Sequence, residues 1–164
     1  TSGRLGAVLL QFPPWFHATR ANAKKIEDLR REHPEAPFAV EFRHASWLAS
    51  DRQGRVLDLL RAQHMSFVGV DAPSGVPPLV AVTRPELAIV RFHGHNRAGW
   101  AKPRAEVVER FNYLYDPDEL RGWVEPLERL THEAREVHAV FNNCVRDYAV
   151  LNAKDLAAIV SETP

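Results

Sequence analysis

Cysteine is almost absent from this sequence: Cys144 is the single one in 164 residues, so no disulfide can form within the chain. That usage favours a reducing compartment, and we expect a cytoplasmic protein. Apolar runs stay below the roughly 18 residues that cross a bilayer, and no basic-then-apolar leader opens the chain. The 21 basic and 21 acidic side chains cancel, which argues against binding nucleic acid through bulk charge.

What the sequence does contain is a series of short apolar runs with the length of buried strands. The first, LGAVLLQF, ends at two consecutive prolines, which do not continue a strand. The later runs are rich in the valine, phenylalanine and isoleucine that strands favour. We expect five strands, over residues 5–12, 38–42, 65–70, 87–92 and 137–141.

Segments with helical periodicity separate these apolar runs. Thr19 can cap a helix whose apolar face is Ala23, Ile26 and Leu29. Ser50 or Asp51 is a start signal for a helix with apolar residues at 56, 57, 59 and 60. The last helix is expected over 152–160. Before that last helix, a cap at Asp116 and a proline at 117 begin another helix. Its single apolar stripe is made of Leu120, Trp123, Val124, Leu127 and Leu130.

This alternation indicates an α/β fold with a mainly parallel sheet. A (β/α)8 barrel takes about 31 residues per unit, so 164 residues hold about five units. The chain is then either an open five-stranded sheet or most of a barrel that lacks its beginning, in a single domain over 1–164. Two stretches break the rhythm: a proline-rich connection over 71–85 and an insertion over 94–115 that is rich in Arg, Trp and Tyr.

Polar side chains gather at the carboxyl ends of the expected strands. Alternation places Glu41 and Arg43 on one face of their strand, and Arg91 and His93 on one face of another. Parallel sheets and barrels place their ligand sites at this rim. The pattern therefore predicts a polar site at the strand ends, where the other polar residues are Gln11, Asp71 and Asn142.

Five stretches, in order along nearly the whole chain, carry a family resemblance. They are LLQFPPWF at 9–16, AVEFRHASWL at 39–48, VRFHGH at 90–95, RFNYLYDPDEL at 110–120 and FNNCVRDYAVLNA at 141–153. Together they resemble the YecE-like proteins, also called domain of unknown function 72.

The resemblance implies a TIM-barrel-like fold with no settled biochemical activity. It also implies that this chain lacks about three N-terminal βα units of such a barrel, including a first strand like Gly-Thr-Ser-Gly-Trp. Residues 1–6 resemble the stretch just before the family's fourth strand. Where the family has a histidine after Phe-Asn-Asn, this chain has Cys144.

The two strand-end arginines predict an anionic ligand. Arg43 and Arg91 can hold a phosphate or carboxylate, while Glu41, His93 or Asp71 transfers a proton. By fold analogy, our hypothesis is a hydrolase or lyase that acts on a phosphorylated or nucleic-acid-derived small anion without a cofactor. The alternative is a lumenal salt-bridge network that neutralises itself. The further residues expected to contact substrate are Gln11, His44, His95, Tyr113, Asn142 and Asn143.

Three other interpretations stay open. His93 and His95 share a face and can ligate a divalent metal with Asp71 or Glu41, although no cluster of zinc spacing exists. The insertion over 94–115 can instead make the protein a non-catalytic module that contacts nucleic acid or a protein through aromatic and basic side chains. A part-barrel with two open edges can also be functionally inert and self-associate.

Overall fold

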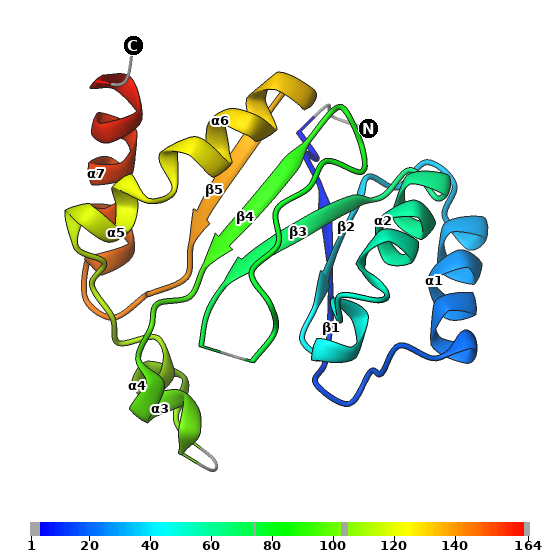
Figure 1. Ribbon diagram of the computed structural model, residues 1–164, viewed down its shortest axis with the longest axis horizontal. Coiled ribbons are helices and arrows are strands. Elements are labelled where there is room, and N and C mark those ends of the chain that lie inside the picture. Colours follow the sequence, from blue (N-terminus) through cyan, green and yellow to red (C-terminus); the bar gives the residue numbers. More distant parts are fainter. Residues whose placement is uncertain (1–3, 74, 103–104, 163–164) are drawn as a thin grey trace.

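The computed structural model describes residues 4–73, 75–102 and 105–162, in which five parallel strands form one sheet (Figure 1). The strands lie side by side in chain order, so that neighbours in the sequence are neighbours in space. This sequential parallel order is that of a (β/α) barrel. The strands are β1 (Val8–Phe12), β2 (Phe38–Phe42), β3 (Ser66–Asp71), β4 (Ala88–Phe92) and β5 (Val137–Phe141).

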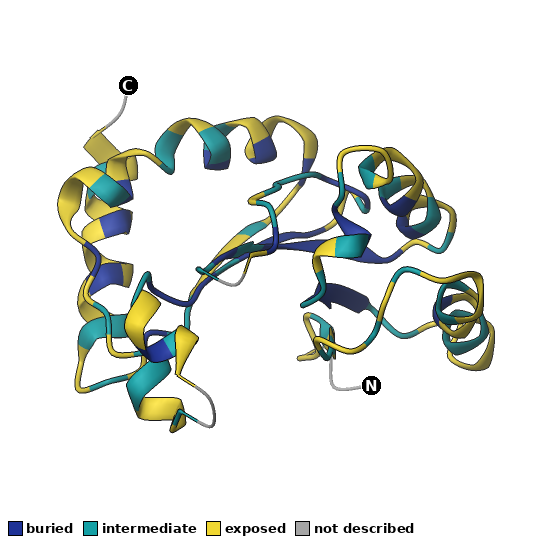
Figure 2. Cartoon of the chain, turned by 60° about the horizontal axis from the view of Figure 1, so that its bottom comes forward, coloured by how far each residue is buried: buried dark blue, intermediate teal, exposed yellow. Residues whose placement is uncertain are grey.

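Helices cover one face of this sheet. Figure 2 shows the longer helices in an arc around the outer side of the curved sheet, whose other face is concave. The longer helices are α1 (Arg20–Glu32), α2 (Gln53–Ala62), α6 (Val124–Glu133) and α7 (Tyr148–Glu162). The short ones are η1 (Ala45–Trp47), α3 (Arg97–Ala101), α4 (Val107–Arg110) and α5 (Pro117–Arg121).

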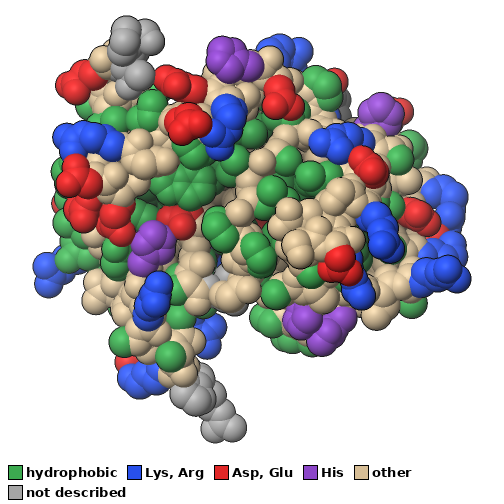
Figure 3. Space-filling view, viewed as in Figure 1, with side chains coloured by type: hydrophobic (Ala, Val, Ile, Leu, Met, Phe, Trp, Pro, Cys, Tyr) green, Lys and Arg blue, Asp and Glu red, His purple; other side chains and the backbone are tan. Residues whose placement is uncertain are grey.

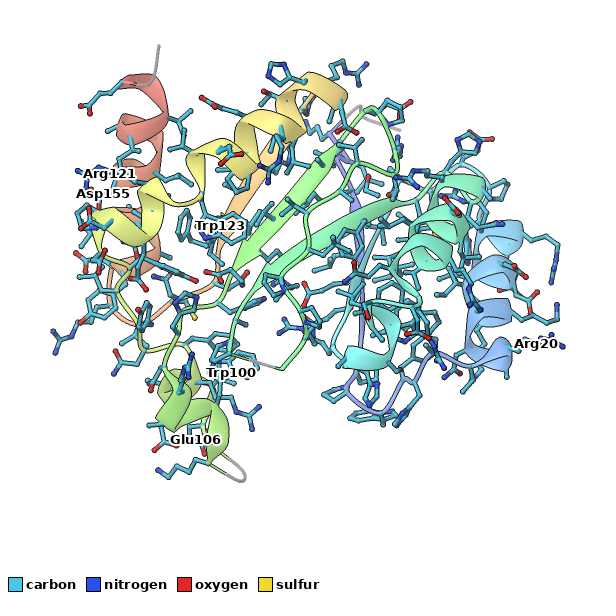
Figure 4. The ribbon with its side chains drawn as sticks, in the orientation of Figure 1. Arg20, Trp100, Glu106, Arg121, Trp123 and Asp155 are labelled. Carbon is cyan, nitrogen blue, oxygen red and sulfur yellow. The ribbon has the colours of Figure 1, made fainter. Side chains whose placement is uncertain are left out.

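Aromatic side chains bury the contact between the sheet and its helices in two clusters. Near α1 and α2, Phe42 stacks on Trp47 with ring centroids 4.4 Å apart. Near α5, α6 and α7, Phe92 stacks on Phe141 at 4.6 Å and meets the edge of Trp123 at 4.9 Å. Figure 4 shows Trp123 close to the junction of α5 and α6. A smaller apolar cluster fills the concave face and consists of Ala39, Val68, Leu87 and Ile89.

The predicted strands and the first helix are confirmed. Every strand lies within its predicted stretch or extends one residue beyond it. Thr19 caps α1, because its hydroxyl accepts a hydrogen bond of 3.2 Å from the backbone N–H of Asn22, and Ile26 is fully buried under the helix. The described residues of the 72–85 connection contain no helix or strand, as the prolines predict.

The single helix predicted from Asp116 onward is wrong. The chain forms α5 and then α6, with a turn at Gly122 and Trp123 between them. Glycine has a low helix propensity, and the turn lets the Trp123 ring reach the edge of Phe92. The cap itself is confirmed, since the Asp116 carboxylate accepts from the backbone N–H groups of residues 118 and 119.

The predicted boundaries of two other helices are also corrected. Helix α2 begins at Gln53, and Arg52 at its cap position makes no side-chain cap; the predicted start residue Asp51 precedes that position, and its carboxylate lies 3.7 Å from the guanidinium of Arg52. Helix α7 begins at Tyr148, one turn before the predicted residue 152. Propensity alone fixes helix ends poorly, because packing decides which turns persist.

Both edges of the sheet are open in the part of the chain that the structure describes, where β1 and β5 each pair with one strand. On the concave face beside these edges, Leu9 is 43% exposed and Val140 is 39% exposed. An apolar groove of about 440 Å³ lies between α6, β5 and α7, where Figure 3 shows hydrophobic side chains gathered. Self-association through the edges stays a prediction. No helix among the described residues is long and apolar enough to cross a bilayer.

Replacing Phe92 by alanine should destabilise the fold by about 3–5 kcal/mol, because it empties a fully buried ring site between β5 and Trp123. Urea unfolding followed by circular dichroism measures this loss. The control is Val108→Ala on α4, where the side chain is 63% exposed and the expected change is within about 0.5 kcal/mol. Equal losses in the two variants would contradict the packing described here.

Candidate functional site

A fully buried carboxylate, that of Glu41, forms the centre of a polar cluster on the concave face of the sheet. Glu41 lies near the carboxyl end of β2, on the face opposite Phe42. One oxygen pairs with Nε of Arg43, and the other accepts from Nη1 of Arg91 at 2.5 Å. The carboxylate therefore holds two guanidinium groups, one from the residue just after β2 and one from β4, which are not adjacent in the sheet.

Two amide side chains complete the partners of these arginines. Gln11 Oε1, from β1, accepts from Arg43 at 3.2 Å and from Arg91 at 3.1 Å. Asn142 Oδ1, just after β5, accepts from Nε of Arg91 at 3.0 Å. The cluster thus draws on four of the five strands, and acceptors fix the orientation of both guanidinium planes.

His93 belongs to this cluster as a titratable side chain that stays uncharged. Its Nε2 lies 2.9 Å from Nη2 of Arg43, and because a guanidinium only donates, Nε2 accepts and the ring proton sits on Nδ1. Burial lowers the pKa of His93 to about 3, and the charges of Arg43 and Arg91 act in the same direction. His93 is therefore uncharged at neutral pH, and its buried Nδ1–H has no partner in the part of the chain that the structure describes.

The two arginines of the cluster carry two positive charges and Glu41 carries one negative charge, so one positive charge is not neutralised. Arg43 and Arg91 both pair with Glu41, and among the described residues neither reaches a second carboxylate. The side chains of the two arginines are only 10% and 13% exposed. Burial lowers the pKa of Arg43 from its ordinary value; the charge of Glu41 opposes this shift, and the charge of Arg91 adds to it. An anion at this face would offset the surplus charge.

A second polar cluster lies at the same rim but on the other side of the sheet. Asp71 alternates with Val70 along β3 and shares the face of the buried core residue Phe67. Its carboxylate accepts from the hydroxyl of Tyr115 at 2.8 Å and pairs with Nε2 of His95 at 2.8 Å. The structure therefore separates Asp71 from the Glu41 cluster, in which the sequence had grouped it.

His95 links Asp71 to helix α5. Its Nδ1 lies 3.1 Å from the carboxylate of Glu119, which also accepts from the hydroxyl of Tyr113 at 2.5 Å. Burial lowers the pKa of His95, but hydrogen bonds and charges of Asp71 and Glu119 outweigh it and raise the pKa above its ordinary value. For both tyrosines burial raises the pKa, and the neighbouring carboxylates raise it further. The result is a closed network that fastens residues 113–115 to β3.

Glycine is required at residue 94, where the chain leaves β4 for this network. Gly94 has φ +83°, and a Cβ there would lie 2.4 Å from the Cβ of Tyr113. Its N–H donates to the hydroxyl of Tyr115 at 2.8 Å. The left-handed turn thus lets His93 face the concave side while His95 reaches Asp71.

The remaining predicted residues have local roles in the structure. Asn143 is fully buried, and its amide donates to the carbonyl of Tyr113 at 2.9 Å and to Asn152 at 2.8 Å. His44 caps η1 by accepting from the backbone N–H of Ser46 at 3.1 Å. Neither side chain has a contact with the arginines among the interactions of the described residues. Cys144 is an exposed free thiol.

The described residues contain no group of three or more His, Cys, Asp or Glu side chains placed to hold a metal ion. His95 does lie between two carboxylates, but each of its nitrogens binds a different one, so the three groups do not converge on a point.

The structure brings together six of the predicted residues: Gln11, Glu41, Arg43, Arg91, His93 and Asn142. Asp71, His95 and Tyr113 form the separate network instead. Sequence reasoning missed Glu119 and Asn152, which anchor that network from α5 and α7. Glu119 was visible only as an acidic residue in the first turn of a helix, and nothing local marks Asn152.

These features define a barrel-type α/β protein with a polar site on the concave face of its sheet. The chain belongs to the DUF72 family, described as a protein of unknown function, whose family model matches residues 1–164. The UPF0759 protein YunF of Bacillus subtilis is 31% identical over an alignment of 168 residues, which covers 97% of this chain and 59% of that protein.

Solved structures of the same family agree with the fold. A DUF72 protein from Enterococcus faecalis matches with a TM-score of 0.90 at 30% identity, over 99% of this chain and 61% of that one. A DUF72 protein from Thermotoga maritima matches with a TM-score of 0.83 at 34% identity, over 94% of this chain and 57% of that one. This chain thus spans about three fifths of the length of these relatives. The family and the parallel α/β fold expected from the sequence are confirmed.

The stabilisation that His95 contributes should fall as pH rises. Because its folded pKa is raised, the contribution is fully present below the unfolded value of about 6.5 and is lost as pH rises through the folded value. The measurement is the difference in urea unfolding free energy between the wild type and His95→Gln, from about pH 5 to pH 9. We expect this difference to shrink across that range.

The control is His138→Gln, at a ring near the carboxylate of Glu136 with a side chain 48% exposed, where we expect a small difference. The protonation of His93 also makes stability depend on pH, but it does so equally in the wild type and in His95→Gln. Its effect therefore cancels in the difference between their unfolding free energies. A difference that stays constant or grows with pH would contradict a charged His95 between Asp71 and Glu119.

Proposed function

We propose that this protein binds a small anionic substrate on the concave face of its sheet and acts on it as a hydrolase or lyase. The observation that supports this is the surplus positive charge of the buried cluster, in which two arginines share the single carboxylate of Glu41. A phosphate or carboxylate group is the natural partner for such a pair, because the guanidinium fork matches its oxygens.

In this proposal Arg43 and Arg91 bind the anion. Glu41 has both oxygens engaged by guanidinium groups, so we assign it to positioning the arginines and not to carrying a proton. Gln11 and Asn142 steady the same groups. The free Nδ1–H of His93 is a hydrogen-bond donor beside the bound anion.

A small anion fits better than a long polyanion. The arginine side chains are about nine-tenths buried, so a phosphate in a nucleic-acid backbone would have to enter the concave face to reach them. The zero net charge of the chain also gives no long-range attraction for a polyanion. Hydrolase or lyase chemistry is the part of the proposal that rests on fold analogy, since barrels act at the carboxyl ends of their strands.

Arg91→Lys should weaken the binding of inorganic phosphate roughly 10- to 100-fold. Lysine keeps the charge but loses the fork, and a lost charge-assisted hydrogen bond is worth about 1.5–3 kcal/mol. Isothermal titration calorimetry measures the affinity. The matched control is Arg129→Lys, an exposed arginine of α6 that pairs with Glu125, and it should leave the affinity unchanged. Equal affinities in both variants, or no binding by the wild type, would refute the anion site.

Turnover should depend on Glu41 as well as on the arginines. A panel of phosphoesters, each assayed with and without a divalent metal, should contain a substrate whose turnover falls in both Glu41→Gln and Arg91→Ala. The reason is that Glu41→Gln releases both guanidinium groups from their shared acceptor. Turnover that is unchanged in both variants would remove the enzymatic part of the proposal.

A further inference from the structure

The ring of His93 belongs to a small aromatic group above the cluster. Its centroid lies 5.4 Å from that of Phe111 and 6.4 Å from that of Trp100, and the last two are 5.8 Å apart. Trp100 comes from α3, within the insertion that the sequence singled out. The insertion therefore places its tryptophan next to the neutral histidine of the proposed anion site.

Two N–H donors in this group have no acceptor among the described residues. The Nδ1–H of His93 and the Nε1–H of Trp100 are both buried, and neither has a hydrogen-bond partner in the part of the chain that the structure describes. They cannot satisfy each other, because Nε2 of His93 already accepts from Arg43 and both remaining groups donate. Buried donors without partners are rare and costly, so an acceptor from outside the chain is the natural complement.

The position of Trp100 is held firmly by its neighbours. The side chain of Asn96 caps α3 and donates to the carbonyl of Glu109 at 2.7 Å. Gly99 lies against the same carbonyl so closely that a Cβ would come within 2.3 Å of it. Helix α3 is thus clamped on α4, and the indole has a defined place relative to His93.

A cavity of about 440 Å³ gives access to this indole. Its walls include Trp100 and Arg97 from α3, together with Pro73 and Gly75 from the connection after β3. Figure 4 shows Trp100 at the end of the molecule where this connection and α3 meet. The residues that line this cavity come from α3 and from the connection after β3, so it reaches the aromatic group from the side of Trp100.

We propose that the Nε1–H of Trp100 and the Nδ1–H of His93 bind a second, uncharged oxygen of the same substrate, so that the substrate is a small anion with a carbonyl group. This rests on the proposed function. The surplus charge of the cluster is matched by the first anionic group, and neutral donors then favour a neutral acceptor over a second anion. Trp100 and His93 thereby determine which anions bind.

A pair of isosteric phosphates tests this proposal. 2-Oxopropyl phosphate carries a carbonyl group, and 2-methylpropyl phosphate has a methyl group in place of the carbonyl oxygen. The wild type should bind the first at least about tenfold more tightly, which corresponds to one hydrogen-bonded acceptor. Trp100→Phe keeps an aromatic ring and loses the N–H, so it should remove most of this preference. Trp15→Phe, at a ring 77% exposed, is the matched control.

Nuclear magnetic resonance of the indole N–H groups gives an independent readout. The Trp100 resonance, assigned from Trp100→Phe, should move downfield with 2-oxopropyl phosphate and far less with its isostere. The internal reference is Trp47, whose Nε1–H already donates to the carbonyl of Phe16 at 2.6 Å and should not move.

The outcomes separate the two proposals. If both phosphates bind equally well, or if Trp100→Phe keeps the preference, the subsite is overturned while the anion site stands. A Trp100 resonance that is unmoved by 2-oxopropyl phosphate overturns it as well. If neither phosphate binds the wild type, the anion site fails and the subsite fails with it.

Discussion

A buried carboxylate must be paired, and that constraint on Glu41 organises the concave face of this protein. An unpaired charge with no solvent contact is costly, so Glu41 requires partners on both oxygens. Arg43 and Arg91 supply them from two strands, and each then needs acceptors for its remaining N–H groups. Those acceptors come from β1 and from the end of β5. One carboxylate thereby couples the two halves of the sheet.

Strand alternation divides the polar residues at the rim into two groups with different tasks. Side chains on the concave face form the Glu41 cluster, which keeps one unbalanced positive charge. Asp71 lies on the helix side of the sheet, where it joins His95, Glu119, Tyr113 and Tyr115 in a network of side chains that bind one another. In our proposal the first group binds a ligand, whereas the bonds of the second group hold His95, Tyr113 and Tyr115 of the insertion in place. The same insertion then presents Trp100 to the first group.

Much of the fold was predictable because its signals are local. The strand runs, the cap at Thr19 and the irregular stretch after β3 all follow from a few consecutive residues. The helix predicted through Gly122 failed because its break depends on where the ring of Trp123 packs, which is a tertiary contact. The sequence analysis offered a self-neutralising salt-bridge network as the alternative to an anion site. In the structure both arginines pair with Glu41, but the two positive charges exceed its one negative charge.

The sequence by itself determined the parallel α/β architecture, the family and the rim at which polar groups gather. The reason is that two patterns are written along the chain: strands alternate with helices, and side chains within a strand alternate between its two faces. Only the tertiary structure decided which of those groups meet. Gln11 and Arg91 are 80 residues apart and share a hydrogen bond, while Asp71, which also ends a strand, lies on the opposite face. Among the residues that the structure describes, the fold also leaves the N–H groups of His93 and Trp100 without acceptors. Whether a buried polar atom finds a hydrogen-bond partner depends on all of its neighbours in space, and no pattern in the sequence shows which residues those neighbours are.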